Sequence, residues 1–163
     1  FVRRAWRPHD AVLGREDELK GYHDLDRHPN ARLIPGLLLY RFDAPLFFAN
    51  AGYFRRRVRR LVRAATHPVR WVVVAAEPIT DIDTTAADIL RQLLEELRQQ
   101  QVTLAFAELK GPVKVRLERY GLYTAVGPDR FFPTVGTAVD GYVEATGTAW
   151  VDWEERRAPA PPG

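Results

Sequence analysis

Thr80-Asp81-Ile82-Asp83-Thr84-Thr85-Ala86-Ala87-Asp88 is a polar stretch between two segments with strong secondary-structure signals. The preceding segment, residues 71–76, is a short apolar and β-branched run that predicts a strand covered on both faces. In the segment that follows, apolar residues recur at helical spacing up to Leu97 and charged residues fill the opposite face, which predicts an amphipathic helix. A buried strand followed by such a helix is typical of a parallel α/β sheet.

The polar stretch itself is a candidate helix start. A short side-chain oxygen at Asp83 or Thr84 can accept hydrogen bonds from the unpaired N–H groups of a first helical turn. The helix dipole also favours an anion at this end, including a phosphate carried by a threonine. We therefore treat Thr80, Asp81, Asp83, Thr84 and Thr85 as a candidate regulatory loop that could bind an anion or a nucleotide. The alternative is that the stretch is only a helix cap.

Composition places the chain among globular proteins. It has 163 residues, 46% of them hydrophobic, which suffices for one domain that buries roughly 70% of its unfolded surface. Cysteine is absent, which excludes disulfides, thiolate metal sites and cysteine nucleophiles. No apolar run approaches the ~20 residues of a membrane-spanning helix, so we expect this fragment to be soluble. Methionine is also absent, and we interpret the chain as a piece of a longer protein.

A second helical pattern carries a run of arginines. Residues 51–66 show an apolar stripe at helical spacing, and Asn50 is placed to cap this helix. The arginines between Arg55 and Arg63 occupy the other faces, where they repel one another unless an anion is near. This basic face could be simply solvated, could contact anionic lipid or an acidic partner, or could bind nucleic acid. Because no aromatic residues alternate with the arginines, we expect no nucleic-acid partner.

The rest of the chain adds further strands and helices. We expect strands at residues 11–13 (an edge strand), 37–42 and 102–107, and either a strand or an aromatic core plug at 46–48. We expect a helix from Pro112 to Tyr120 that Gly121 ends, a short strand or turn at 131–132, and a last helix capped by Thr134 or Thr137. These elements predict a single mixed, mostly parallel β-sheet of about four to five strands with about four α-helices.

The segments outside these elements are interpreted as loops and tails. Residues 1–8 are basic and read as a linker, residues 9–146 as the domain, and residues 147–163 as a disordered C-terminal tail. Residues 15–30 are charged and are expected to form a solvated loop. His23 and His28 in this loop are a weak signal for a metal site, and we expect none.

Three segments of the chain resemble a known family. They are Arg7-Pro8 with Leu13-Gly14-Arg15, then residues 35–50 (Pro-Gly-Leu-Leu-Leu-Tyr-Arg-Phe-Asp-Ala-Pro-Leu-Phe-Phe-Ala-Asn), and Asp81-Ile82-Asp83-Thr84-Thr85. Together they look like the STAS domain at the cytoplasmic C-terminus of sulfate permease (SulP) anion transporters. The resemblance implies a place on the cytoplasmic side of the plasma (inner) membrane, with the linker leading from a membrane domain of the same polypeptide.

The wider relatives of that family are anti-sigma factor antagonists, which are phosphorylated on a serine just after the aspartate of this loop. Asp83 matches the family aspartate, so the resemblance makes Thr84 the candidate phosphosite. The chain departs from the antagonists in having threonine for serine and Ala86-Ala87 where a glycine is usual. Some domains of the family bind nucleotides. Since this chain lacks a Gly-x-x-x-x-Gly-Lys loop, a guanine or adenine nucleotide would have to use the helix start and the strand ends, and no cofactor is required.

Three functions are therefore compared. The first is a regulatory domain of a SulP-type sulfate or anion transporter, with contacts to its membrane domain, a cytosolic protein or a second copy. The second is a free-standing anti-sigma factor antagonist in a partner-switching pathway. The third is an enzyme that uses Asp81, Asp83 and Asp88 as a metal or acid–base cluster. Because aspartates at a helix start are usually caps, we expect no catalytic residues.

Overall fold

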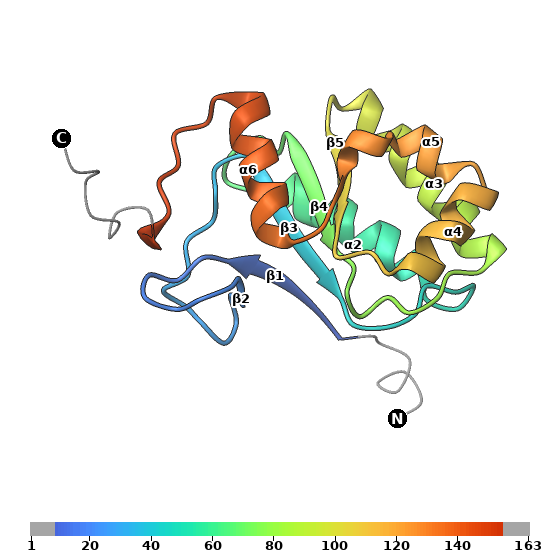
Figure 1. The fold of residues 1–163 in the computed structure, drawn as a ribbon, viewed down its shortest axis with the longest axis horizontal. Helices are drawn as coiled ribbons and strands as arrows, with labels where there is room; N and C mark the ends of the chain where they lie inside the picture. Colours follow the sequence, from blue (N-terminus) through green and yellow to red (C-terminus); the bar gives the residue numbers. More distant parts are fainter. Residues whose placement is uncertain (1–8, 155–163) are drawn as a thin grey trace.

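The strand at the centre of the fold is β4 (Trp71–Ala75), and all five of its residues are buried. It belongs to a six-stranded sheet in the computed structural model, which describes residues 9–154 (Figure 1). The sheet has the order β2-β1-β3-β4-β5-β6. The other strands are β1 (Asp10–Gly14), β2 (His23–Asp24), β3 (Leu37–Phe42), β5 (Thr103–Ala107) and β6 (Phe131–Phe132).

The sheet is mixed and mostly parallel, as the sequence predicts. Strands β3, β4, β5 and β6 are parallel to one another, whereas β1 is antiparallel to both β2 and β3. The sheet exceeds the expected four to five strands because β2 has only two residues and carries no periodic signal, whereas β6 is the short strand that was one alternative for residues 131–132. The short strand expected at 11–13 is β1, but it is not at the edge, because β2 pairs with its outer side.

Helices cover both faces of the sheet (Figure 1). One face packs against α2 (Ala51–Ala64), α3 (Thr84–Gln99), α4 (Gly111–Arg119) and α5 (Leu122–Val126). The other face packs against α6 (Val135–Thr146). Successive strand side chains point to opposite faces, so Val72 and Val74 join the first core while Val73 joins the second. This double coverage explains the continuous apolar run of β4.

The ends of two helices follow the sequence signals. Gly121 ends the helix before it with a φ of 75°, a left-handed conformation that glycine adopts freely. Thr134 caps α6 and forms a capping box with Thr137, so both candidate residues take part. The sequence did not predict α5, because five residues are too few to show helical periodicity. A short 3₁₀ helix, η1 (Pro128–Arg130), leads from α5 into β6.

Asp10 ties the first strand to its neighbours. Its Oδ2 accepts hydrogen bonds from the hydroxyl of Tyr40 at 2.7 Å, the hydroxyl of Tyr53 at 3.1 Å and Nε of Arg57 at 3.2 Å. Tyr40 lies in β3, and the other two donors lie one turn apart in α2. Burial, with the hydrogen bond to Asp10, raises the pKa of Tyr40 well above its usual range. One carboxylate therefore joins β1, β3 and α2.

The basic face of α2 is neutralised in part within the domain. Arg55 donates to Glu96 of α3 at 2.6 and 2.8 Å, and Arg59 pairs with the same carboxylate at 2.8 Å. The hydrogen bond from Arg55 lowers the pKa of Glu96 below its ordinary value. With Arg57 on Asp10, three arginines have intramolecular partners. The expected solvated face thus reduces to the exposed Arg56, Arg60 and Arg63.

Two segments interpreted as solvated loop and disordered tail are in contact with each other. Arg15, at the start of the expected loop, is only 5% exposed and pairs with Asp152 and Glu154. Within the tail that was expected to be disordered over 147–163, residues 148–154 make charge and aromatic contacts with the rest of the domain. Residues 1–8, interpreted as a linker, and 155–163 lie outside the described residues. Within residues 9–154, no helix has both the length and the apolar character needed to cross a membrane.

Candidate functional site

Asp83 holds the start of α3 to a neighbouring loop. Its Oδ1 accepts the backbone N–H of Ala86 at 2.8 Å, which is the expected helix cap. Its Oδ2 accepts the backbone N–H of Phe48 at 2.9 Å. The two carboxylate oxygens thus have different partners, one in the helix and one 35 residues earlier in the chain. Of the two candidate caps, Asp83 performs the role and Thr84 begins the helix.

The backbone brings the same two segments side by side. Leu46 and Ile82 form an isolated parallel β-bridge, in which Leu46 N–H donates to Asp81 and Asp83 N–H donates to Leu46. Both apolar side chains at this bridge are buried, at 2% and 1% exposure. Residues 45–50 and 80–88, which were separate motifs in the sequence, therefore form one surface. We call it the α3-start surface.

Asn50 stabilises this surface in a way that the sequence did not predict. No side-chain hydrogen bond from Asn50 caps α2. Instead, its Oδ1 accepts the N–H of Phe47 at 3.0 Å and its Nδ2 donates to the carbonyl of Pro45 at 2.7 Å. Asn50 is 5% exposed, so both bonds are shielded from water and fix the turn formed by 45–50.

Phe48 is the apolar projection of the α3-start surface. The alternatives for residues 46–48 were a strand or an aromatic core plug, and Leu46 alone is buried. Phe48 is 70% exposed, and its ring meets that of Phe47 edge to face with centroids 5.6 Å apart. The hydrogen bond from its N–H to Asp83 fixes the backbone that presents this ring. The alternation of apolar and polar residues gave no signal for an exposed phenylalanine here.

The hydroxyl and carboxylate residues of the candidate loop lie at the surface. Thr80, Asp81, Thr84 and Thr85 are exposed, and Asp83 is half-buried between helix and turn. Asp81 Oδ1 accepts the N–H of Ile82 at 2.8 Å and pairs with Nε of Arg116 from α4 at 3.2 Å. Arg116 is a cation that sequence reasoning missed, because its pairing with the loop is a tertiary contact.

The geometry of the α3-start surface suits recognition of a binding partner. Asp83 and Asp81 both accept structural hydrogen bonds, the first as a cap and the second within its own turn. What faces solvent is an aromatic ring, three threonines and the positive end of a sixteen-residue helix. These groups can form an apolar contact, and Thr84 can accept a modification.

A cavity of about 620 Å³ lies elsewhere, where the ends of β4 and β5 meet the first turn of α6. Its lining includes Arg15, Tyr22 and Arg41 together with five carboxylate residues. None of Thr80, Asp81, Asp83, Thr84 and Thr85 lines it. The candidate nucleotide loop and this cavity are therefore separate features, and the excess of carboxylates disfavours a polyanion in the cavity.

The mixed, mostly parallel sheet with helices on both faces defines the fold class of this protein. The family model of the STAS domain matches residues 28–138, and the chain belongs to this family. A probable sulfate transporter of Mycobacterium tuberculosis is 41% identical over 142 residues, which cover 87% of this chain and 25% of the relative. The chain thus spans about a quarter of the length of that curated relative.

Solved structures show the same fold. The murine anion transporter Slc26a9 superimposes with a TM-score of 0.76 and 16% identity, covering 89% of this chain and 24% of that one. The STAS domain of a SulP transporter from Vibrio cholerae superimposes with a TM-score of 0.60 and 18% identity, covering 76% of this chain and 93% of that domain. The anti-sigma factor antagonist SpoIIAA superimposes with a TM-score of 0.55 and 14% identity, covering 73% of this chain and 96% of that one. The fold is therefore shared by transporter domains and antagonists alike.

Proposed function

We propose that this chain is the cytoplasmic regulatory domain of a sulfate or related anion transporter and that it acts by docking through the α3-start surface. Support for the transporter comes from the relative in Mycobacterium tuberculosis, a probable sulfate transporter four times longer than the shared segment. The observation that carries the docking role is Phe48, which is 70% exposed on a turn that Asp83 and Asn50 hold rigid. The partner is the membrane domain of the same polypeptide, a cytosolic protein or a second copy.

The energetics of such docking follow from the exposed ring. Burying a phenylalanine side chain contributes about 1.5–3 kcal/mol, and a preformed turn avoids the entropy cost of ordering. A phosphate on Thr84 would add about −1.5 to −2 charge beside Asp81 and Asp83. The helix dipole and Arg116 oppose this repulsion only in part. Phosphorylation at Thr84 would therefore weaken an apolar contact centred on Phe48.

Sulfate uptake by the full-length transporter tests this function. Phe48→Ser and Thr84→Glu should each reduce uptake at equal membrane protein levels, with docking weakened about tenfold for the loss of ~1.4 kcal/mol. Thr66→Glu is the matched control, because Thr66 is an exposed threonine outside this surface. Uptake that is unchanged in both variants would show that the α3-start surface has no regulatory role.

Two binding partners are secondary proposals. The N–H groups of the first turn of α3 support an anion, and calorimetry with GTP and ATP, repeated on Thr84→Glu, tests for a nucleotide there. The exposed Arg56, Arg60 and Arg63 support contact with anionic lipid, which vesicle co-sedimentation with and without phosphatidylserine tests. No heat change in the first assay, or no dependence on lipid charge in the second, would reject the respective partner.

A free-standing antagonist is the alternative. The fold does not discriminate between the two roles, because the antagonist SpoIIAA shares it. An open reading frame that continues upstream into several spanning helices would exclude the antagonist role. We also propose that the domain has no turnover of its own, and hydrolase activity abolished by Asp83→Asn would contradict this.

A further inference from the structure

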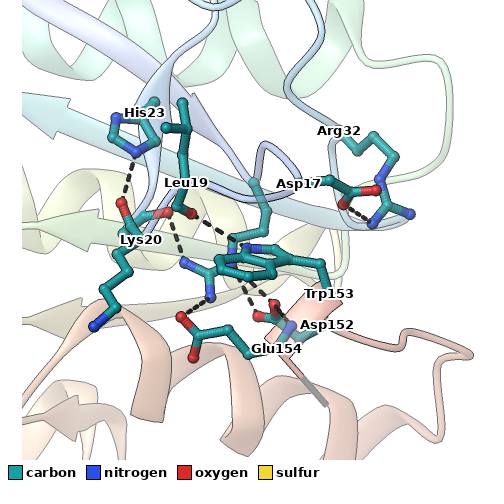
Figure 2. A network of polar contacts seen from close by, with 10 residues as sticks. Asp17, Leu19, Lys20, His23, Arg32, Asp152, Trp153 and Glu154 are labelled. Carbon is teal, nitrogen blue, oxygen red and sulfur yellow. Dashed lines mark hydrogen bonds and ion pairs between the residues drawn. The ribbon is translucent and has the colours of Figure 1, made fainter. Parts of the chain in front are cut away.

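Residues 148–154 lie against the hairpin formed by β1 and β2. Nε of Arg15 donates to both carboxylate oxygens of Asp152, at 3.1 and 3.0 Å, and its Nη2 lies 3.3 Å from Glu154. Trp153 donates its indole N–H to the carbonyl of Leu19 at 3.2 Å (Figure 2). The segment thus contacts the hairpin through two carboxylates and an indole ring.

The receiving surface consists of hairpin residues and of Arg32, which pairs with Arg15 in an isolated antiparallel bridge. The guanidinium of Arg15 is oriented by the carbonyl of Gly21, to which Nη1 donates at 2.7 Å, and by the ring of Tyr22, whose centroid is 5.1 Å away. Arg32, held by Asp17 at 2.9 Å, lies 4.8 Å from the ring centroid of Trp150. Two arginines are therefore fixed in place to receive carboxylate and aromatic groups.

The docked segment is attached by side chains alone. No backbone–backbone hydrogen bond among residues 9–154 joins 148–154 to the rest of the domain. Val151 is 54% exposed, and the indole nitrogen of Trp150 is buried without an acceptor in the described part of the chain. The buried unsatisfied donor of Trp150 opposes docking, and Glu154, the second partner of Arg15, is half exposed. The segment is thus held in the manner of a bound peptide.

We propose that the β1–β2 hairpin is a docking site for acidic, aromatic peptide segments, occupied here by residues 150–154 of the same chain. The site recognises two carboxylates, both of which pair with the guanidinium of Arg15. It also recognises two indole rings, one that packs against Arg32 and one that donates its N–H to the carbonyl of Leu19. An acidic aromatic peptide from another molecule can replace the internal segment. Asp152 and Glu154 also line the cavity of about 620 Å³, so the bound segment forms part of the wall of that cavity.

A labelled peptide with the sequence of residues 148–154, Thr-Ala-Trp-Val-Asp-Trp-Glu, tests the proposal by fluorescence anisotropy. In the full chain, Asp152→Asn with Glu154→Gln should release the internal segment and increase probe affinity about tenfold over the wild type. Glu118→Gln with Asp129→Asn removes two exposed carboxylates elsewhere and should leave probe affinity at the wild-type level. Adding Arg15→Gln to the released variant should abolish binding.

Equal probe affinity for the wild type and the released variant would overturn the proposal, as would binding that survives Arg15→Gln. A second measurement avoids substitutions in the site. The chain has four tryptophans, and ¹⁹F NMR of fluorotryptophan-labelled wild type should show the Trp153 resonance moving to its free position as unlabelled peptide 148–154 is added in excess. A Trp153 resonance that does not respond to the peptide would also overturn it. Neither result depends on sulfate uptake, so the proposal for this docking site and the proposal for the α3-start surface can be rejected independently.

Discussion

Removal of the Asp83 carboxylate tests how the α3-start surface is held together. Asp83→Ala removes the cap on Ala86 and the acceptor for the Phe48 N–H, whereas Asp83→Asn retains one acceptor oxygen for one of these two donors. The two substitutions therefore separate the helix cap from the link to the neighbouring turn. Asp88→Ala is the matched control, because Asp88 is an exposed aspartate in the same helix.

The expected losses follow from the two hydrogen bonds. A lost helix cap costs about 1 kcal/mol. The bond to Phe48 is exposed to solvent, so it contributes about 0.5–1 kcal/mol. Asp83→Ala should therefore lower the free energy of unfolding by about 2 kcal/mol, and Asp83→Asn by about 1 kcal/mol. Asp88→Ala should stay within about 0.5 kcal/mol of the wild type.

Urea denaturation followed by circular dichroism measures these differences, with hydrogen exchange at the Phe48 amide as a local readout. The midpoint should fall in the order wild type, Asp83→Asn, Asp83→Ala, with an unchanged slope. Equal losses for Asp83→Ala and Asp88→Ala would refute the assignment of Asp83 as the residue that holds the surface. A stability of Asp83→Asn equal to the wild type would show that the Phe48 bond contributes nothing.

Three further predictions concern the rest of the fold. Gly36→Ala should cost about 2 kcal/mol or more in urea denaturation, because Gly36 has a φ of 79° and a Cβ there would clash with the Tyr142 hydroxyl; a neutral result would contradict this. Glu96→Gln should destabilise by about 1 kcal/mol near pH 7. Since hydrogen bonding from Arg55 lowers the pKa of Glu96, that stabilisation is present above its ordinary pKa of 4.5 and is lost as the pH falls through the lowered value, so wild type and variant should converge at pH values below that lowered pKa. Burial raises the pKa of Tyr22 to about 12, so phenolate absorbance that Tyr22→Phe removes should develop near pH 12; a midpoint near 10 would show that Tyr22 is solvated.

The central elements could be predicted because their signals are local. The apolar run of β4 and the helical spacing after Asp83 both depend on residues close together in the chain, and the cap lies where the pattern begins. The helix start was therefore located correctly from sequence alone. β2 and α5 were missed because two and five residues are too few for periodicity.

Asn50 shows how local chemistry can mislead. Its position before α2 matches a cap, but the side chain bonds back to Phe47 and Pro45 within its own turn. Short amide and carboxylate side chains can satisfy either arrangement, and the sequence does not choose between them. The choice here depends on Leu46 docking beside Ile82, a contact between distant residues.

Charge pairing was the least predictable feature. The pairs of Arg55 and Arg59 with Glu96 require two helices to pack at a given register. Arg15 and Asp152 are 137 residues apart in the chain. Neither contact leaves a pattern in one sequence, so a buried guanidinium and a docked C-terminal segment were interpreted as solvent-exposed chain.

Asp10 has a mechanical consequence for the domain. It is the first residue of β1, and tension applied to the chain at residue 9 would act along that strand and shear it against β3. The backbone bond from Asp43 N–H to His9 and the three donors on the Asp10 carboxylate bear this load, and two of those donors lie in α2. That helix begins directly after the turn that presents Phe48. Traction on the first strand is thus transmitted to the start of α2 and to the turn beside it.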